Sequence, residues 1–584
     1  MYKIQKSLNY KVKCENTTGA IIILCLSAVL AICVGVPLFV HRFYYLGSDS
    51  VGYFGIAATL AGKDWGDVLA TVSTYSYGYA LLLIPAFWIQ KKAGDVLLYA
   101  AFLNTFLIVL AFIFTYKCIS RFCQGKKAIL YAFGITVYSG SISSSQYYGA
   151  DLLLLTLFWM LLYLIIRFID TKKIFYGIMV PLLGTLLYAT HQRSLVIVAA
   201  IFILNTILVL DKKIDIHTFF ICLSVQILFL VVIKLGYSNF GAVFPRVTGG
   251  EDANSASTRW SYFVEEVFTI EFWFRTIKNI FRQFLYVGFS TLNVAIVPVI
   301  IWFFKLKCNR KERDIIFYLE GFIIAVLLMQ IIMVVVMLNP TRVDMLGMGR
   351  YVDYIIPSLC MFWFIDIGNE NIYQNKKKIV LFILMILNLV GIFCFQVDYK
   401  ILKDLGNFGQ GNYVGEAWIV DAGVSWLKVF LLIITFDFFF IFKFNNRSKT
   451  MGIIILAVYF LFCYIHAYPY IHDTTLDKEE NYSFLADEFE EYAITDAYWP
   501  YLNGSVEMRH FQVFCSNLQF HCYLSDTAQY EGNENELFKR KSDVLHDREG
   551  SVYMMMEKDV EQISDKYNVK VIGQINGLVV AIVE

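Results

Sequence analysis

Long stretches of apolar residues recur along most of this chain and alternate with short polar connections. The first stretch, residues 19–40, has 22 residues without a charge, which is enough for a helix to cross the ~30 Å hydrocarbon core of a membrane. It exceeds the apolar region of about 7–15 residues found in a cleaved signal peptide, so we interpret it as an uncleaved anchor. Similar runs follow as far as residue 469, and they predict about thirteen transmembrane helices.

Lys and Arg residues indicate how these helices are oriented, because connections on the cytoplasmic side of a membrane carry an excess of positive charge. Basic connections such as 117–127 and 305–313 alternate with connections that are not basic. The alternation predicts that residues 1–18 form a cytoplasmic N-terminus and that the basic connections lie on the same side. Loops 41–95 and 236–283 then fall on the outer face.

Within the first outer loop, the apolar segment YALLLIPAFWI (79–89) has only eleven residues. It is too short to span, and a crossing would reverse the orientation that the basic connections require. We therefore expect a helix at the membrane surface, or one partly embedded there. A spanning helix is the alternative that the pattern leaves open.

The last part of the chain, residues 470–584, has the pattern of a soluble unit. SVYMMM, VKVIG and LVVAIV read as strands, and the polar segment EKDVEQISDKY between them reads as a helix. The predicted fold class is therefore an all-α polytopic membrane protein over residues 19–469, followed by a small extracytoplasmic α/β domain over residues 470–584. Cys515 and Cys522 lie in this domain, and a disulfide or two free thiols would both suit its outer location.

Composition supports this division. The chain has 584 residues, of which 58% are hydrophobic and only 17% are charged, whereas soluble domains carry about 25% charged residues. With a net charge of +1 and no basic array, nothing points to a nucleic-acid partner. Membrane lipid is the expected surrounding.

Two acidic residues stand out at the outer ends of predicted helices. Asp49 follows the first span closely, and Asp151 opens a later span after the serine-rich stretch SGSISSSQYYG. Charged groups at such positions are costly, and they usually pair with each other or line a water-filled cavity. Two simpler interpretations stay open, namely a solvated loop residue for Asp49 and a helix cap for Asp151.

Cationic residues gather at the outer side as well. His191 and Arg193 lie in a tight polar turn between two spans, and Arg342, Arg350 and Tyr351 lie where an outer loop re-enters the membrane. Arginine binds phosphate or carboxylate through two parallel hydrogen bonds, and outer loops disfavour cations. The arginines could therefore serve an anionic ligand, anchor a helical hairpin or pair with neighbouring aspartates.

The order of these features resembles that of the GT-C superfamily of integral membrane glycosyltransferases. The likeness rests on Asp49 with Tyr53 after the first span, the segment YSYGYALLLIPAFWI that contains Tyr77, the span opened by Asp151, the turn YATHQRSL and the segment GRYVDYIIP. It covers roughly residues 15–370. It is closest to the bacterial branch related to protein mannosyltransferases and the lipid A aminoarabinose transferase, the family 39-like glycosyltransferases.

The resemblance implies a function at the outer face of the cell membrane. Members of the superfamily transfer a sugar, with inversion, from a polyprenyl-phosphate-linked donor to a glycan, lipid or protein acceptor. By this likeness Asp49 corresponds to the general base and Asp151 to a second acidic residue of the site, while Arg193 and Arg350 correspond to residues that meet the donor phosphate. The remaining substrate-binding candidates are Tyr53, Tyr77, His191, Arg342 and Tyr351.

Departures from the family pattern leave metal use and the acceptor open. Asp49 is followed by Ser50 where relatives have Asp-Glu, and Tyr75–Tyr79 replaces a Glu-Lys-Pro motif. A pair of outer carboxylates, Asp49 and Asp151, suits Mg²⁺ or Mn²⁺. A transporter or flippase of a lipid-linked glycan and a non-catalytic cell-envelope assembly protein are the alternative functions.

Overall fold

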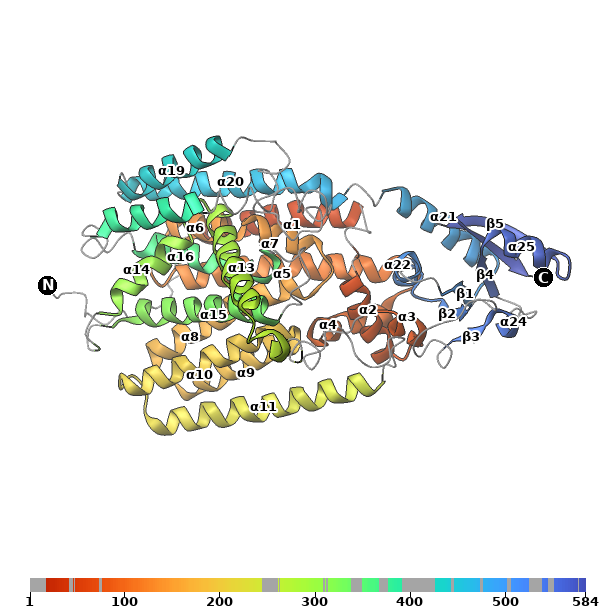
Figure 1. The fold of residues 1–584 in the computed structure, drawn as a ribbon, viewed down its shortest axis with the longest axis horizontal. Coiled ribbons are helices and arrows are strands. Elements are labelled where there is room, and N and C mark those ends of the chain that lie inside the picture. The colour runs from red at the N-terminus through yellow and green to blue at the C-terminus, as the bar shows by residue number, and fades with distance from the viewer. Residues whose placement is uncertain are drawn as a thin grey trace.

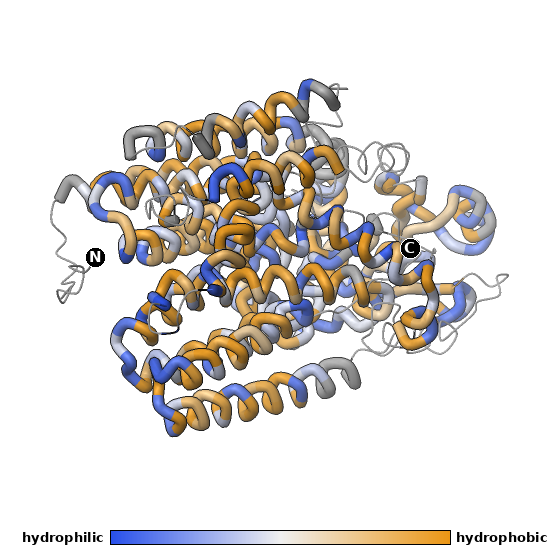
Figure 2. The backbone as a smooth tube through the Cα atoms, turned by 60° about the vertical axis from the view of Figure 1, so that its left-hand side comes forward, coloured by the Kyte–Doolittle hydropathy of each residue, from blue (hydrophilic) through white to orange (hydrophobic). Residues whose placement is uncertain are grey.

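The computed structural model describes most of the chain, and all statements below concern that part. It comprises residues 17–40, 46, 48–72, 76–243, 261, 263–307, 310, 313–337, 349–366, 376–390, 426–442, 446–472, 476–501, 506–524, 538–544, 551–575 and 577–583. Long helices run side by side, and a small sheet domain lies beyond one end of them (Figure 1). Figure 2 shows that hydrophobic residues dominate these helices.

Seven helices of the described residues are long and apolar enough to cross a membrane. They are α1 (Thr17–Val40), α5 (Asp95–Ile119), α8 (Ala150–Thr171), α10 (Leu195–Leu210) with the preceding turn, α11 (Ile216–Val243), α15 (Ile315–Met337) and α20 (Asn446–His472). Shorter apolar helices add to the bundle, including α9 (Ile174–Thr190), α16 (Ile356–Asp366), α19 (Trp426–Phe442) and residues 376–390. The predicted all-α multi-pass fold is therefore confirmed.

Two of the apolar runs in the sequence form broken helices. The first comprises α6 (Lys126–Thr136) and α7 (Ser139–Gln146), and the second comprises α13 (Ile270–Phe289) and α14 (Ile296–Lys305). At the second break Leu292 and Asn293 adopt left-handed backbone angles, with φ of 49° and 62°. The Asn293 side chain donates to Asp437 of α19 and to Asn388, and Asn388 donates to Asp437 as well.

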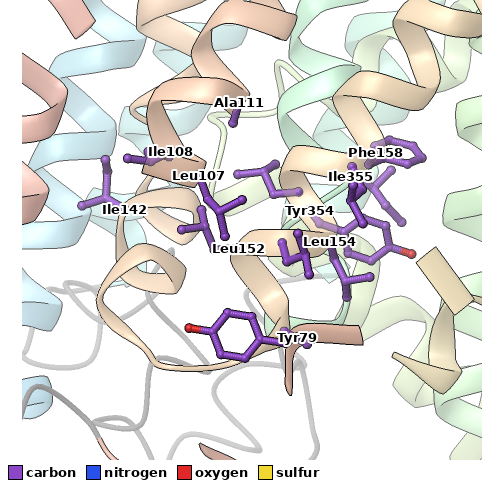
Figure 3. Packing of buried hydrophobic residues seen from close by; sticks show 14 of the residues in the cluster. Tyr79, Leu107, Ile108, Ala111, Ile142, Leu152, Leu154, Phe158, Tyr354 and Ile355 are labelled. Carbon is purple, nitrogen blue, oxygen red and sulfur yellow. The ribbon is translucent and has the colours of Figure 1, made fainter. Parts of the chain in front are cut away.

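The core of the bundle surrounds α8, which contacts α5, α9 and α15. Its apolar side chains are buried against neighbours such as Leu107 of α5, and the ring of Phe158 meets that of Tyr354 edge-on at 5.5 Å (Figure 3). Helix α11 lies at the edge of the bundle and exposes apolar side chains such as Leu228. Such exposure is expected of a helix that faces lipid.

Three short helices between α1 and α5 form a compact unit: α2 (Ser48–Leu60), α3 (Gly66–Ala70) and α4 (Gly78–Ile89). Gly55 of α2 leaves no room for a side chain, because a Cβ there would lie 2.4 Å from Leu69 of α3. Trp65 is buried and meets Phe87 of α4 edge-on. At twelve residues, α4 is about 18 Å long and too short to span; it packs against α2 and α9.

The predicted small α/β domain is also present. Its six-stranded sheet has the order β3-β2-β1-β4-β6-β5, in which strands β1 to β4 are parallel to one another and β6 is antiparallel to both β4 and β5. Its elements are α21 (Leu476–Glu491), β1 (Asp496–Pro500), α22 (Val506–Phe514), β2 (Gln519–Leu524), β3 (Lys539–Arg540), α24 (Lys541–Val544), β4 (Ser551–Met555), α25 (Glu557–Ser564), β5 (Val569–Ile575) and β6 (Leu578–Val583). Cys515 and Cys522 are buried free thiols.

The domain rests on the short helices of the first loop. Helix α22 contacts α2, α3 and α5, and the Phe514 carbonyl accepts a hydrogen bond of 2.8 Å from the Gly94 N–H at the start of α5. Arg509 donates to Thr71, and Ser516 donates to Gln90. The sheet domain and the 48–95 segment therefore lie at the same end of the bundle.

The second predicted loop, 236–283, is largely helical where it is described. Helix α11 continues to Val243, and α13 begins at Ile270. Residues 244–260 lie outside the described part of the chain.

Candidate functional site

The two aspartates singled out in the sequence each occupy the first turn of a helix. Asp49 is the second residue of α2, and Asp151 is the second residue of α8. The N-terminal end of a helix carries a partial positive charge, which stabilises a carboxylate there. Each side chain therefore has a local electrostatic reason for its position, independent of any partner.

Two arginines are brought to the same place by short 3-10 turns. Arg193 lies in η1 (Gln192–Ser194) between α9 and α10, and Arg350 lies in η4 (Gly349–Tyr351) ahead of α16. His191 caps η1, since its Nδ1 accepts the Arg193 backbone N–H at 3.3 Å. The histidine thus fixes the turn that presents the arginine.

These four side chains form one connected group, the carboxylate–arginine cluster: Asp49, Asp151, Arg193 and Arg350. Arg350 lies between the two acids, with its Nη1 3.1 Å from Asp49 Oδ2 and its Nε 2.6 Å from Asp151 Oδ2. The other oxygen of Asp151 pairs with Nη2 of Arg193. Residues from four segments far apart in the sequence therefore meet at a single point.

The members of the cluster differ in exposure. The side chains of Asp151 and Arg193 are 6% and 5% exposed, whereas those of Asp49 and Arg350 are 23% and 22% exposed. Burial works to lower the pKa of Arg350, but the charges of Asp151 and Asp49 outweigh it and hold that pKa well above its usual value. Asp49 and Arg350 form the accessible side of the cluster, and Asp151 and Arg193 form its base.

Aromatic rings enclose the guanidinium groups. Arg350 lies over the ring of Tyr147 at 4.7 Å, and Arg193 lies 5.2 Å from the ring centre of Tyr351. Such contacts stabilise a cation over the face of a ring. Tyr53 is buried beside the two acids, and burial, followed by the charges of Asp49 and Asp151, raises its pKa well above its usual value. Its hydroxyl therefore stays protonated.

A small pocket adjoins the cluster on the side of the serine-rich helix α7. Within the described chain, the buried Ser141 Oγ and the Nε of Arg193 have no hydrogen-bond partner. Buried polar atoms are seldom left unpaired, so these two atoms mark a place for a bound polar group or water. The pocket is lined by Gly140, Ser141, Ser144, Asp151, Leu155, Arg193, Arg350, Asp353 and Tyr354.

Asp353 forms the far wall of this pocket. Its Oδ1 accepts hydrogen bonds from Tyr138 at 2.6 Å and from Tyr286 at 2.9 Å. Two glycines permit this approach: a Cβ on Gly140 would lie 2.5 Å from the Asp353 carboxyl, and one on Gly349 would lie 1.8 Å from the Tyr286 ring. The turn that holds Arg350 is thus fitted closely to α7 and α13.

Among the described substrate-binding candidates, Tyr77 lies apart from the cluster and its surrounding residues. The Tyr77 hydroxyl donates to the Ile233 carbonyl, and its ring packs against Tyr237, so in this structure it joins α4 to α11. Arg342 lies outside the described residues.

The comparison with solved structures finds a match over almost the whole chain. The chain matches the apo crystal structure of ArnT from Cupriavidus metallidurans over 97% of its own length and 98% of that chain, with a TM-score of 0.52 and 10% sequence identity. This chain has the ArnT fold. The ArnT structure bound to undecaprenyl phosphate matches with the same values. The predicted fold, a helical membrane domain followed by a small C-terminal α/β domain, is thus shared with this solved structure.

Other comparisons add little to the ArnT match. An oligosaccharyltransferase from Archaeoglobus fulgidus matches at a TM-score of 0.42, with 10% identity over 86% of this chain and 64% of that one, which is too loose to support an argument. No protein-family model and no curated protein sequence matches this chain.

The contacts of the carboxylate–arginine cluster bear on the metal expected from the sequence. Both oxygens of Asp151 face guanidinium nitrogens, and Asp49 faces Arg350. Two arginines beside the same carboxylates repel a further cation. Within the described residues, no group of three or more His, Cys, Asp or Glu side chains is placed to hold a metal ion. The donor set therefore does not fit Mg²⁺ or Mn²⁺.

Sequence reasoning missed several residues of the site. Tyr147 and Ser141 lie in the serine-rich stretch that indicated a polar space near Asp151, and that composition was the available signal. Asn104 of α5 holds this segment by donating to the Ser145 and Tyr147 carbonyls. An isolated Asn within an apolar run gives no indication of which backbone it will bind.

Proposed function

We propose that this protein transfers a sugar from a polyprenyl-phosphate-linked donor to an acceptor hydroxyl at the outer face of the membrane. The observation that carries the proposal is the position of Arg350 between Asp49 and Asp151 at 3.1 Å and 2.6 Å. Arg350 can bind a phosphate and the neighbouring Asp49 can act as a base, so both groups lie within a single site. A transferase of this kind needs these two components.

The arginines are the proposed ligands of the donor phosphate. Arg350 is accessible and Arg193 is buried behind it, so an incoming phosphate would meet Arg350 first. Guanidinium groups bind phosphate oxygens in pairs, and their charge stabilises the leaving phosphate as its negative charge grows. The ArnT structure that contains undecaprenyl phosphate has the same fold, and this supports a polyprenyl phosphate carrier here.

Asp49 is the proposed general base. It is the more exposed acid of the two, so an acceptor hydroxyl can reach it. The hydroxyl oxygen attacks the anomeric carbon, the bond from that carbon to the phosphate oxygen breaks, and its electron pair leaves with the phosphate. The hydroxyl proton passes to Asp49. Attack opposite the leaving group inverts the anomeric centre, and general-base help of this kind contributes about 10²–10⁴-fold.

Asp151 is proposed to position the arginines and not to react. Both of its oxygens are held by Arg350 and Arg193, and its side chain is 6% exposed. A carboxylate that is buried and paired with two guanidinium groups is a weaker base than Asp49. It neutralises two buried cations and fixes the direction of both guanidinium planes.

The test uses the full-length protein in nanodiscs, with lipid-linked sugars extracted from bacterial membranes and radiolabelled in the sugar. We expect the wild type to move label from the lipid to an acceptor fraction, and Asp49→Asn to lose this transfer by ~10²-fold or more while still binding undecaprenyl phosphate. Asp170→Asn is the control, since Asp170 pairs with Arg121 at the other end of the bundle. Passage of labelled lipid between leaflets without a covalent product would favour a flippase instead.

A further inference from the structure

A second pocket lies at the end of the bundle opposite the carboxylate–arginine cluster. It is formed by the connection between α8 and α9 and by the connection between α10 and α11 (Figure 1). Its volume is about 540 Å³, which is within the range of ligand pockets. It is lined by Lys172, Val209, Lys212, Lys213, Ile214, Asp215, Ile216 and Thr218.

The three lysines of this pocket are not neutralised by the protein. Within the part of the chain that the structure describes, Lys172, Lys212 and Lys213 form no ion pair, although ion pairs at the same end are formed by other residues. Three lysines therefore line one hollow with a single acidic residue, Asp215, and an anion bound among them would be stabilised by the excess of positive charge.

The acids beside Lys212 and Lys213 in the sequence, Asp211 and Asp215, are already engaged, as is Asp170 beside Lys172, which pairs with Arg121. Asp211 is held by Arg313 at 2.9 Å and by the Tyr318 hydroxyl at 3.0 Å. Asp215 caps the start of α11, accepting the Thr218 N–H at 2.8 Å and the Thr218 hydroxyl at 2.8 Å. Both carboxylates are thus oriented by other groups, and neither forms an ion pair with Lys172, Lys212 or Lys213 within the described chain.

The backbone at two of the lysines is unusual. Lys172 ends α8 with a φ of 56°, and Lys212 follows α10 with a φ of 55°. These left-handed conformations favour glycine, and at a lysine they carry a conformational cost. Strained positions of this kind are found where a side chain has a task that glycine cannot perform.

Exposed apolar side chains border the pocket on the helices that form it. Phe175 of α9, Leu210 of α10 and Phe220 of α11 are 59%, 58% and 57% exposed. An anion held by the lysines would therefore have apolar surface directly beside it on the membrane side. A ligand with a charged head and apolar chains matches both features, whereas a small free anion uses only the first.

We propose that this pocket binds the phosphate head group of an anionic phospholipid from the adjacent leaflet, with its acyl chains along Phe175, Leu210 and Phe220. Basic pockets between transmembrane helices are suited to such head groups. An excess of lysine at one face of a membrane protein is expected from its topology alone. Topology does not explain why these lysines line a pocket, why the adjacent acids bind other groups, or why two of the lysines have a positive φ. The proposal does not depend on the proposed transferase activity.

The experiment measures lipid binding to the full-length protein by native mass spectrometry, from nanodiscs of phosphatidylcholine with increasing phosphatidylglycerol. The test variant is Lys172→Gly/Lys212→Gly, because glycine relieves the left-handed backbone and removes the charge without harming the fold. The matched control is Lys126→Ala/Lys127→Ala, since these exposed lysines at the start of α6 are not among the residues that line the pocket.

We expect the wild type to retain phosphatidylglycerol specifically, and the test variant to bind it about tenfold more weakly or worse, with phosphatidylcholine unaffected. The control should stay close to wild type. Equal losses in both variants, or equal retention of the two lipids by the wild type, would overturn the proposal. Inorganic phosphate is added in a separate arm; if it displaces the lipid and binds alone as tightly, the site takes a free anion and the lipid assignment is wrong.

Discussion

Asp67 in α3 accepts a hydrogen bond of 2.8 Å from the backbone N–H of Cys522 in β2. The bond joins the C-terminal domain to the helix on which α2 rests, because Leu69 of α3 fills the space beside Gly55 of α2. Helix α2 carries Asp49 in its first turn. A continuous path of contacts therefore runs from the small sheet to the proposed base.

Removing the acceptor at Asp67 should loosen this path. We expect Asp67→Ala to leave the Cys522 N–H without a partner, at a cost of about 1–3 kcal/mol, and to raise hydrogen–deuterium exchange in residues 48–70. Asp67→Asn keeps an acceptor and should restore protection. Gln519→Ala, which removes an exposed bond to Asp64 at the same junction, is the control, and equal exchange in all three variants would contradict the expectation.

The ionisation of Asp67 should make the junction sensitive to pH. Burial raises the pKa of this carboxyl, although the bond from Cys522 opposes the shift. The folded protein then binds more protons than the unfolded chain between the ordinary and the raised pKa, so the free energy of unfolding falls as pH rises through that interval. Thermal melting over a pH series should show this decline, and Asp67→Asn should flatten it.

Asp151 and Asp49 should differ in what their removal does. Asp151→Asn leaves the buried Arg193 and part of Arg350 uncompensated, so we expect a loss of about 3–5 kcal/mol in stability together with activity. Asp49→Asn removes one partly exposed contact and should leave the melting temperature nearly unchanged while it abolishes transfer. The two melting curves and the transfer assay separate these effects, and similar melting temperatures would argue against the positioning role of Asp151.

Gly349 should tolerate no side chain. A Cβ there would lie 1.8 Å from the Tyr286 ring, so Gly349→Ala must displace either α13 or the turn that holds Arg350. We expect a loss of roughly 1–3 kcal/mol in stability and weaker binding of undecaprenyl phosphate. Gly19→Ala in α1, where no atom lies within 4 Å of the new Cβ, should melt like the wild type.

Chelation should have no effect on transfer. The guanidinium groups of Arg193 and Arg350 occupy the oxygens that a divalent ion would need. Transfer rates measured with EDTA, and then with added Mg²⁺ or Mn²⁺, are therefore expected to agree. A rate that falls with EDTA and recovers with one of the ions would show that the pairs open to admit a metal.

The sequence predicted the membrane fold because hydrocarbon thickness and loop charge constrain it strongly. It also indicated Asp49, Asp151, Arg193 and Arg350, because charge at the outer end of an apolar helix is costly and hence conspicuous. It could not show that Arg350 bridges the two acids, since that contact joins residues that no local pattern relates. Tyr77 was a predicted substrate-binding residue, but its neighbours in sequence did not indicate that it packs on α11.

The break between α13 and α14 could not be predicted either. The backbone turns at Leu292 and Asn293, which are not residues that usually mark a helix end in an apolar run. Hydropathy predicts burial of such a segment but not its backbone angles. At the break, the Asn293 side chain donates to Asn388 and to Asp437.

The polar group of Asn293, Asn388 and Asp437 joins the break after α13 to α19 and to the helix of residues 376–390. Helix α13 runs from this polar group back to Tyr286, whose hydroxyl donates a hydrogen bond to Asp353 beside the arginines. Removing one amide of this group, as in Asn388→Ala, would therefore act on the carboxylate–arginine cluster indirectly, through the position of α13.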